Sequence, residues 1–138
     1  MTVSAGAEIA GFILNVIDRC NGIQSVWLIG SRANGTASES CDWDLIAFGS
    51  KTVLDCLRRT LELHRPDVDF FVVTNGNEFE NAWGGREKTG SLTHWKWQEI
   101  SEVKAEYTEA KWVGDDENGE VIRKRKLALC LWRRPNAL

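Results

Sequence analysis

The sequence has few prolines, no low-complexity tract and no large excess of charge of either sign. Two prolines among 138 residues, with 43% hydrophobic and 27% charged residues, are typical of a globular rather than a disordered chain. The formal net charge of −3 excludes a molecule that attracts nucleic acid strongly over its whole surface. A chain of this length is expected to fold as one domain, residues 1–138, with a sizeable core.

The cysteines also lack a paired motif, because the four of them are far apart and none belongs to a CxxC sequence (Cys20, Cys41, Cys56 and Cys130). We therefore expect reduced, mostly buried thiols and a cytoplasmic protein. The N-terminal stretch has no basic start, and Glu8 and Asp18 bracket its apolar part. We expect neither a signal peptide nor a membrane span.

Hydrophobic periodicity predicts alternating helices and strands in the first half of the chain. Apolar residues at helical spacing indicate helices, and short apolar runs between turn residues indicate strands. The predicted elements are a helix over residues 4–20, strands over 25–30 and 43–49, a helix over 51–64 and a strand over 68–73. Residues 74–90 are rich in Gly and Asn and predict a long loop with one helical turn around 78–83.

The last third of the chain is predicted to consist of strands. They span residues 92–100, 104–114 and 120–134, and the acidic turn at 115–119 predicts a hairpin between the last two. This order predicts an α+β fold, a mixed sheet flanked by helices with a C-terminal β-hairpin extension. The core would span about residues 4–84 and the β-rich extension about 91–134.

Two aspartates open the second predicted strand. Asp42 and Asp44 are two residues apart, so their side chains point to the same face. Carboxylates held together repel each other, and a divalent cation such as Mg²⁺, which takes oxygen ligands, relieves the repulsion. A third carboxylate on the following strand, Asp69 or alternatively Asp67, would complete a two-metal site, which can activate a hydroxyl and stabilise a leaving phosphate.

A Gly-Ser-Arg turn comes directly before these aspartates. Gly30 lets the backbone approach a ligand closely, and amides at a helix start point toward an anion. Ser31 adds a hydroxyl donor and Arg32 a positive charge, both of which suit a triphosphate. The turn is therefore predicted to bind the phosphates of a nucleotide.

Together, the residues "GSRANGTASESCDWDL" resemble the signature of the DNA polymerase β-like nucleotidyltransferase superfamily, and they are most similar to its minimal nucleotidyltransferase branch. The resemblance covers about residues 26–73, and the matching positions are Gly30, Ser31, Arg32, Gly35, Asp42, Asp44 and Leu45. It implies transfer of a nucleoside monophosphate from a nucleoside triphosphate, with ATP the expected donor, to a hydroxyl acceptor, with release of pyrophosphate. It also implies that Asp42, Asp44 and Asp69 bind Mg²⁺ and catalyse the transfer, and that Gly30, Ser31 and Arg32 bind the nucleotide.

Other interpretations of the same residues remain open. The chain could be a catalytically silent, nucleotide-binding regulatory module of the same fold. It could also bind nucleic acid through Trp95, Trp97 and the basic run Arg123-Lys124-Arg125-Lys126, although the two Trp more often belong to a core and the run to a solvated strand edge. We further expect a partner, either a second copy or a separate subunit, at the C-terminal strands.

Overall fold

A computed structural model of the chain describes residues 2–35, 42–83, 89–114 and 117–135, without the side chains of residues 2–8, 31 and 109–113. The elements in chain order are α1 (Thr2–Arg19), β1 (Ser25–Ile29), α2 (Gly30–Ala33), β2 (Trp43–Phe48), α3 (Lys51–Arg59), the 3₁₀-helix η1 (Leu61–Leu63), β3 (Val68–Val73), β4 (Glu78–Asn81), β5 (Thr89–Ser91), α4 (Leu92–Trp95), β6 (Gln98–Glu99), β7 (Lys104–Val113) and β8 (Glu120–Arg133). No helix in these described ranges is both long enough and apolar enough to cross a membrane.

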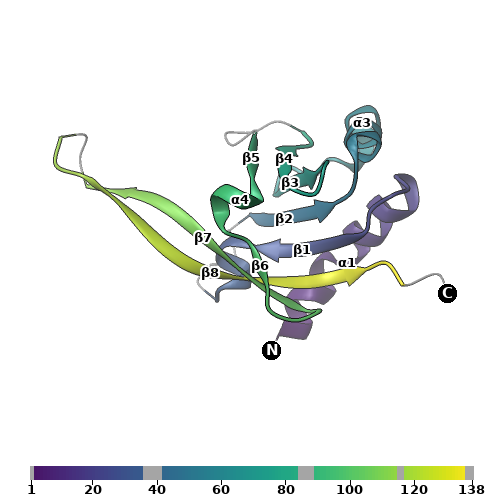
Figure 1. The fold of residues 1–138 in the computed structure, drawn as a ribbon. Coiled ribbons are helices and arrows are strands. Elements are labelled where there is room, and N and C mark those ends of the chain that lie inside the picture. Colours follow the sequence, from purple (N-terminus) through teal and green to yellow (C-terminus); the bar gives the residue numbers. More distant parts are fainter. Residues whose placement is uncertain (1, 36–41, 84–88, 115–116, 136–138) are drawn as a thin grey trace.

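The eight strands form one curved sheet in the order β5-β4-β3-β2-β1-β8-β7-β6 (Figure 1). All neighbouring strands are antiparallel except β2 and β3, which are parallel and joined through α3 and η1. A parallel pair needs such a crossover, because the chain has to return to the end at which the first strand began. The predicted α+β fold with a mixed sheet is confirmed.

The sheet has an apolar cluster on each face, because successive strand residues point to opposite sides. The first cluster packs beneath α1 and α3 and includes Leu45 of β2 and Phe70 of β3. The second cluster lies on the opposite face and includes Ile46, Phe71 and Tyr107. Asp44 and Asp69 alternate with Leu45 and Phe70, so they belong to the second face.

Several segments differ from the predicted secondary structure. Residues 78–81, predicted as part of a helical turn in a long loop, instead form β4, which pairs with β3 at positions that sequence periodicity does not reveal. Residues 92–95, predicted as strand, form α4, because Ser91 caps the helix by accepting the N–H of His94 and Lys96 ends it in the left-handed region, at φ 55°. The long second helix is also divided, since α3 ends at Arg59 and η1 follows.

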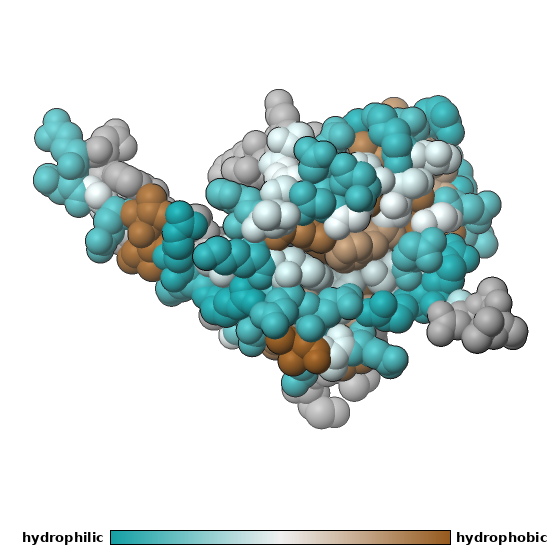
Figure 2. Space-filling model, in the orientation of Figure 1, coloured by the Kyte–Doolittle hydropathy of each residue, from teal (hydrophilic) through white to brown (hydrophobic). Residues whose placement is uncertain are grey.

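The predicted C-terminal hairpin is confirmed. β7 and β8 pair from Lys104 opposite Leu129 to Val113 opposite Glu120. The far half of this hairpin projects from the body as an arm (Figures 1 and 2). The base of β8 lies beside β1, so the extension and the predicted core share one sheet.

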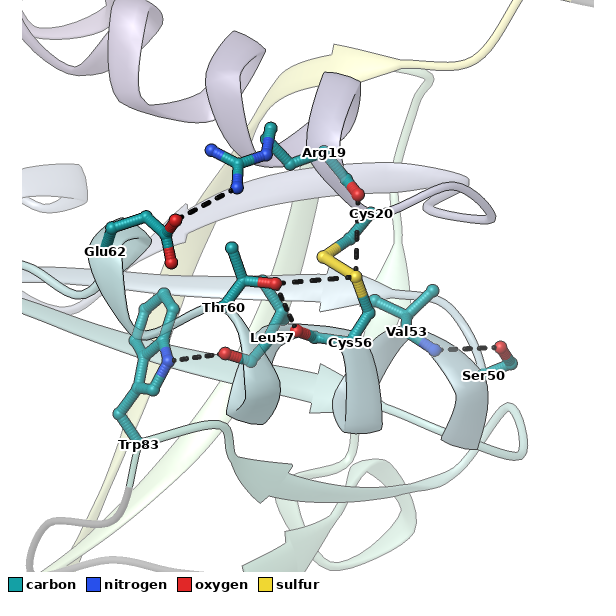
Figure 3. Close-up of a disulfide and its surroundings, with 9 residues drawn as sticks. All are labelled: Arg19, Cys20, Ser50, Val53, Cys56, Leu57, Thr60, Glu62 and Trp83. Carbon is teal, nitrogen blue, oxygen red and sulfur yellow. Dashed lines mark hydrogen bonds and ion pairs between the residues drawn. A yellow bond between two sulfur atoms is a disulfide. The ribbon is translucent and has the colours of Figure 1, made fainter.

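The prediction of reduced thiols is wrong for two cysteines. Cys20, at the end of α1, forms a disulfide with Cys56 of α3, with Cα atoms 5.8 Å apart (Figure 3). A separation of 36 residues gave no indication of the pairing, which arises because both helices pack on the same sheet face. Cys130 is free and half-buried, and burial raises the pKa of its thiol. Cys41 lies outside the described residues, and the cytoplasmic location stays a prediction.

We predict that replacing Cys20 and Cys56 together by serine lowers the free energy of unfolding by about 2–4 kcal/mol, because the disulfide restricts the unfolded chain. Urea unfolding monitored by tryptophan fluorescence measures this loss. Cys130→Ser serves as a control, since it removes a thiol without opening a disulfide. An equal unfolding midpoint for the double variant and the parent, both unreduced, would contradict the pairing.

Candidate active site

The Gly-Ser-Arg turn is built around a glycine that no other residue replaces without strain. Gly30 follows β1 directly and has φ +73°, in the left-handed region. A Cβ at this position would collide with Oδ2 of Asp44, which lies against the turn from the neighbouring strand β2. The structure therefore shows one reason for glycine here, the close approach of the Asp44 carboxylate. Close approach of a ligand to Gly30 stays a prediction.

Asp44 and Asp69 occupy directly paired positions on two parallel strands. Asp44 of β2 lies opposite Asp69 of β3 in the strand register, and both side chains are half-buried. Neighbouring strands are about 4.8 Å apart, so the two carboxylates leave the same face of the sheet at adjacent points. Asp42 lies just before β2 and is exposed. The tertiary structure thus brings together two of the three predicted carboxylates by strand register.

Asp67, the alternative to Asp69, is engaged in an ion pair. It accepts hydrogen bonds from Nε and the terminal nitrogen of Arg65 at 2.9 and 2.6 Å. These bonds hold the pKa of the Asp67 carboxyl below its ordinary value. Because the Arg65 guanidinium occupies both oxygens of Asp67, the geometry favours Asp69 as the third carboxylate.

The described residues contain no group of three or more His, Cys, Asp or Glu side chains placed to hold a metal ion together. The two carboxylates that the register does pair, Asp44 and Asp69, are hard oxygen donors of the kind that Mg²⁺ prefers. The carboxylate oxygens of these two residues are therefore suitable ligands for Mg²⁺. Participation of Asp42 in a two-metal site stays a prediction.

Arg32 of α2 is stacked on the ring of Trp43. Its guanidinium carbon lies 4.0 Å from the ring centroid, a cation–π contact worth about 0.5–1 kcal/mol. Trp43 itself is 4% exposed and packs in the cluster beneath α1 and α3. The positive charge of Arg32 is therefore held beside the turn. The hydroxyl of Ser31 and the segment 36–41 lie outside the described part of the structure.

Tyr107 of β7 contacts the turn, and the sequence analysis did not identify it. The backbone N–H of Gly30 donates a hydrogen bond of 2.8 Å to the Tyr107 hydroxyl. The Tyr107 ring is 3% exposed and is stacked on Trp95 and Trp97, at centroid distances of 5.1 and 6.2 Å. The two Trp residues are half-buried in the second cluster, which supports the core interpretation. They do not share a strand, because Trp95 ends α4.

Asn34 is a second residue that the sequence analysis did not identify. Its Oδ1 accepts the N–H of Leu127 at 2.8 Å, and its Nδ2 donates to the carbonyl of Leu127 at 3.0 Å and to that of Gly30 at 2.8 Å. The side chain of Asn34 thus pairs with β8 as a neighbouring strand would. No local pattern could reveal either contact, because Leu127 is 93 residues from Asn34 and Tyr107 is 77 residues from Gly30.

A cavity of about 440 Å³ lies elsewhere, at β4 and β5. Its lining includes Glu78, Thr89 and His94 but none of the predicted site residues. Comparison of the chain with protein-family models, with curated proteins and with solved structures finds no match. The resemblance to nucleotidyltransferases therefore stays a prediction from the sequence motif.

We predict that Gly30→Ala destabilises the fold by clearly more than Gly35→Ala. Both glycines have positive φ, so each substitution imposes a backbone strain of about 1–2 kcal/mol. Only at position 30 does the added Cβ displace Asp44, since a Cβ at position 35 meets no atom within 4 Å. The difference between their urea unfolding free energies measures the Asp44 contact. Equal losses would show that the carboxylate does not lie against the turn.

We also predict that Tyr107→Phe lowers the free energy of unfolding by about 1–3 kcal/mol, because it leaves the Gly30 N–H without its acceptor. Amide hydrogen exchange at Gly30 should accelerate more than exchange in the preceding strand β1. Trp95→Phe is the matched control, because it reduces the ring contact with Tyr107 and keeps the hydroxyl. If Gly30 exchanged at the parental rate in Tyr107→Phe, the hydrogen bond would be absent in solution.

Proposed function

We propose that the chain is a Mg²⁺-dependent nucleotidyltransferase that moves a nucleoside monophosphate from a nucleoside triphosphate to a hydroxyl acceptor and releases pyrophosphate, with ATP the expected donor. One observation carries the proposal. Asp44 and Asp69 are paired in parallel register, and Asp44 lies against the glycine turn whose sequence resembles the family motif. The two carboxylates, the glycine turn and the positive charge of Arg32 thus lie at the same end of β1, β2 and β3.

The residues of this site have distinct roles in the proposed reaction. Asp44 and Asp69 hold the cation together with the exposed Asp42, and Arg32 attracts the negatively charged triphosphate. Mg²⁺, when bound, stabilises charge on the phosphate oxygens and lowers the pKa of the acceptor hydroxyl. The acceptor oxygen bonds to the α-phosphorus, the bond to the bridging oxygen breaks, and pyrophosphate leaves. Asp69 accepts the proton of the acceptor hydroxyl.

Calorimetric titration of the full chain with ATP, with and without Mg²⁺, tests the proposal independently of the acceptor. We expect Mg²⁺-dependent binding that Asp44→Asn and Asp69→Asn each weaken by about tenfold or more, since each removes a charge from the cation site. Asp55→Asn, on α3, is the matched control and should bind as the parent does. Asp67→Asn distinguishes the two candidates for the third carboxylate, and we expect it to bind normally.

Transfer of label from the α-phosphate of ATP, with release of pyrophosphate, distinguishes an enzyme from a binding module. Binding without any transfer to protein, nucleic acid or small hydroxyl acceptors would favour the silent module. Nucleic-acid binding that is lost with added salt but unchanged in Asp44→Asn would favour the other alternative. Absence of Mg²⁺-dependent ATP binding in the folded parent would contradict the proposal.

A further inference from the structure

Among the residues that the structure describes, no strand pairs with the outer edge of β8, the edge away from β7, along the projecting arm of the hairpin. In the described part of the sheet, β1 pairs with β8 only from Leu129 to Arg133, and β6 pairs with β7 only at Ala105 and Glu106. Beyond these positions the two strands pair with each other alone (Figure 1). A two-stranded hairpin is marginally stable in water, and an unpaired strand edge is a template for another strand.

The hydrogen bonds of Asn34 reveal which backbone groups of β8 face this outer edge. Both the N–H and the carbonyl of Leu127 point to Asn34, away from β7. Backbone groups alternate along a strand, so those of Val121, Arg123 and Arg125 also point outward. The groups of the residues between them point to β7.

The side chains on this edge combine exposed apolar surface with charges of both signs. Val121 is 52% exposed, and Figure 2 shows hydrophobic surface on the arm between hydrophilic residues. Glu120, Arg123 and Lys124 are exposed, and Ile122 is half-buried. The exposed part of Val121 is apolar surface that a second strand paired with this edge would cover.

We propose that a second copy of this chain pairs with the outer edge of β8, antiparallel and strand to strand, about a two-fold axis at Ile122. In this register Glu120 lies opposite Lys124 of the second copy, and Lys124 lies opposite its Glu120. Val121 and Arg123 form the hydrogen-bonded pairs, which agrees with the outward direction of their backbone groups. The Glu–Lys and Ile–Ile pairs occupy the non-hydrogen-bonded positions, where side chains of antiparallel strands approach most closely.

The charge pattern selects this register from its neighbours. A shift by two residues in one direction replaces the Glu120–Lys124 pairs by Glu120–Lys126 pairs, but it also places Arg123 opposite its own copy and Ile122 opposite Lys124. A shift in the other direction places Glu120 opposite Ile122 and loses both Glu–Lys pairs. Like charges directly opposite each other destabilise a strand pair, and opposite charges stabilise it. The basic run that prevents indiscriminate pairing thus permits pairing with a copy of the same strand.

Sedimentation equilibrium of the full chain tests the proposal. We expect a dimer that dissociates on dilution. Glu120→Lys and Lys124→Glu should each raise the dissociation constant by about tenfold, because each places two pairs of like charges in contact. The double variant with both reversals should regain dimerisation, since it restores both pairs. Lys104→Glu, at the base of the arm, is a control with the same change of charge and should leave the dimer unchanged.

Val121→Pro provides a second test that does not depend on charge. It removes an outward N–H and should weaken the dimer, while the bonds between β7 and β8 remain. The thermal unfolding midpoint at low concentration shows whether each variant is folded. A parent that stays monomeric at every concentration overturns the proposal. The proposal also fails if the single charge reversals fold and leave the dissociation constant unchanged, or if the folded double variant does not regain dimerisation.

Discussion

The close contact between the Asp44 carboxylate and the Gly30 turn is the constraint on which the candidate site depends. Because the backbone at Gly30 is left-handed and carries no Cβ, the end of β1 can turn away sharply while the carboxylate of the adjacent strand lies against it. The parallel pairing of β2 with β3 then places Asp69 beside Asp44. Both carboxylates are therefore positioned by paired strands, and residues on strands are held more precisely than residues on loops.

The C-terminal extension completes this arrangement and is part of the same sheet. β8 lies beside β1, and the Asn34 side chain joins the turn to β8 where β1 has ended. On the sheet face of the second cluster, the Tyr107 hydroxyl accepts the N–H of Gly30, and its ring is stacked on Trp95 and Trp97. The extension therefore contributes structure to the candidate site, and it covers with aromatic side chains a sheet face that the core alone would leave open.

The disulfide stabilises the same region from the other side of the sheet. The segment between Cys20 and Cys56 contains β1, the turn and β2, so the covalent loop encloses the whole motif. The sulfur of Cys56 also lies 3.5 Å from the carbonyl oxygen of Arg19 (Figure 3), a packing contact, because a disulfide sulfur has no hydrogen to donate. The disulfide joins the end of α1 to α3 on one face of the sheet, and on the other face the Tyr107 hydroxyl of β7 accepts the N–H of Gly30.

The sequence by itself determined the elements whose signal is local. The short apolar strand β1, the amphipathic helix α1 and the apolar strand β3 were all predicted nearly to the residue, because each has a local hydrophobic pattern typical of its structure. The motif also predicted that Asp44 would meet a carboxylate of the next strand. β4 and α4 were not predicted, since a four-residue element contains too little periodicity to distinguish a strand from a helix.

Only the tertiary structure decided the contacts that join distant segments. It placed Asp69 beside Asp44 through the strand register, it paired Cys20 with Cys56, and it brought Tyr107 and Asn34 to the turn. Each of these contacts depends on which strands become neighbours in the sheet. That choice is made by packing over the whole core, and no window of consecutive residues contains it.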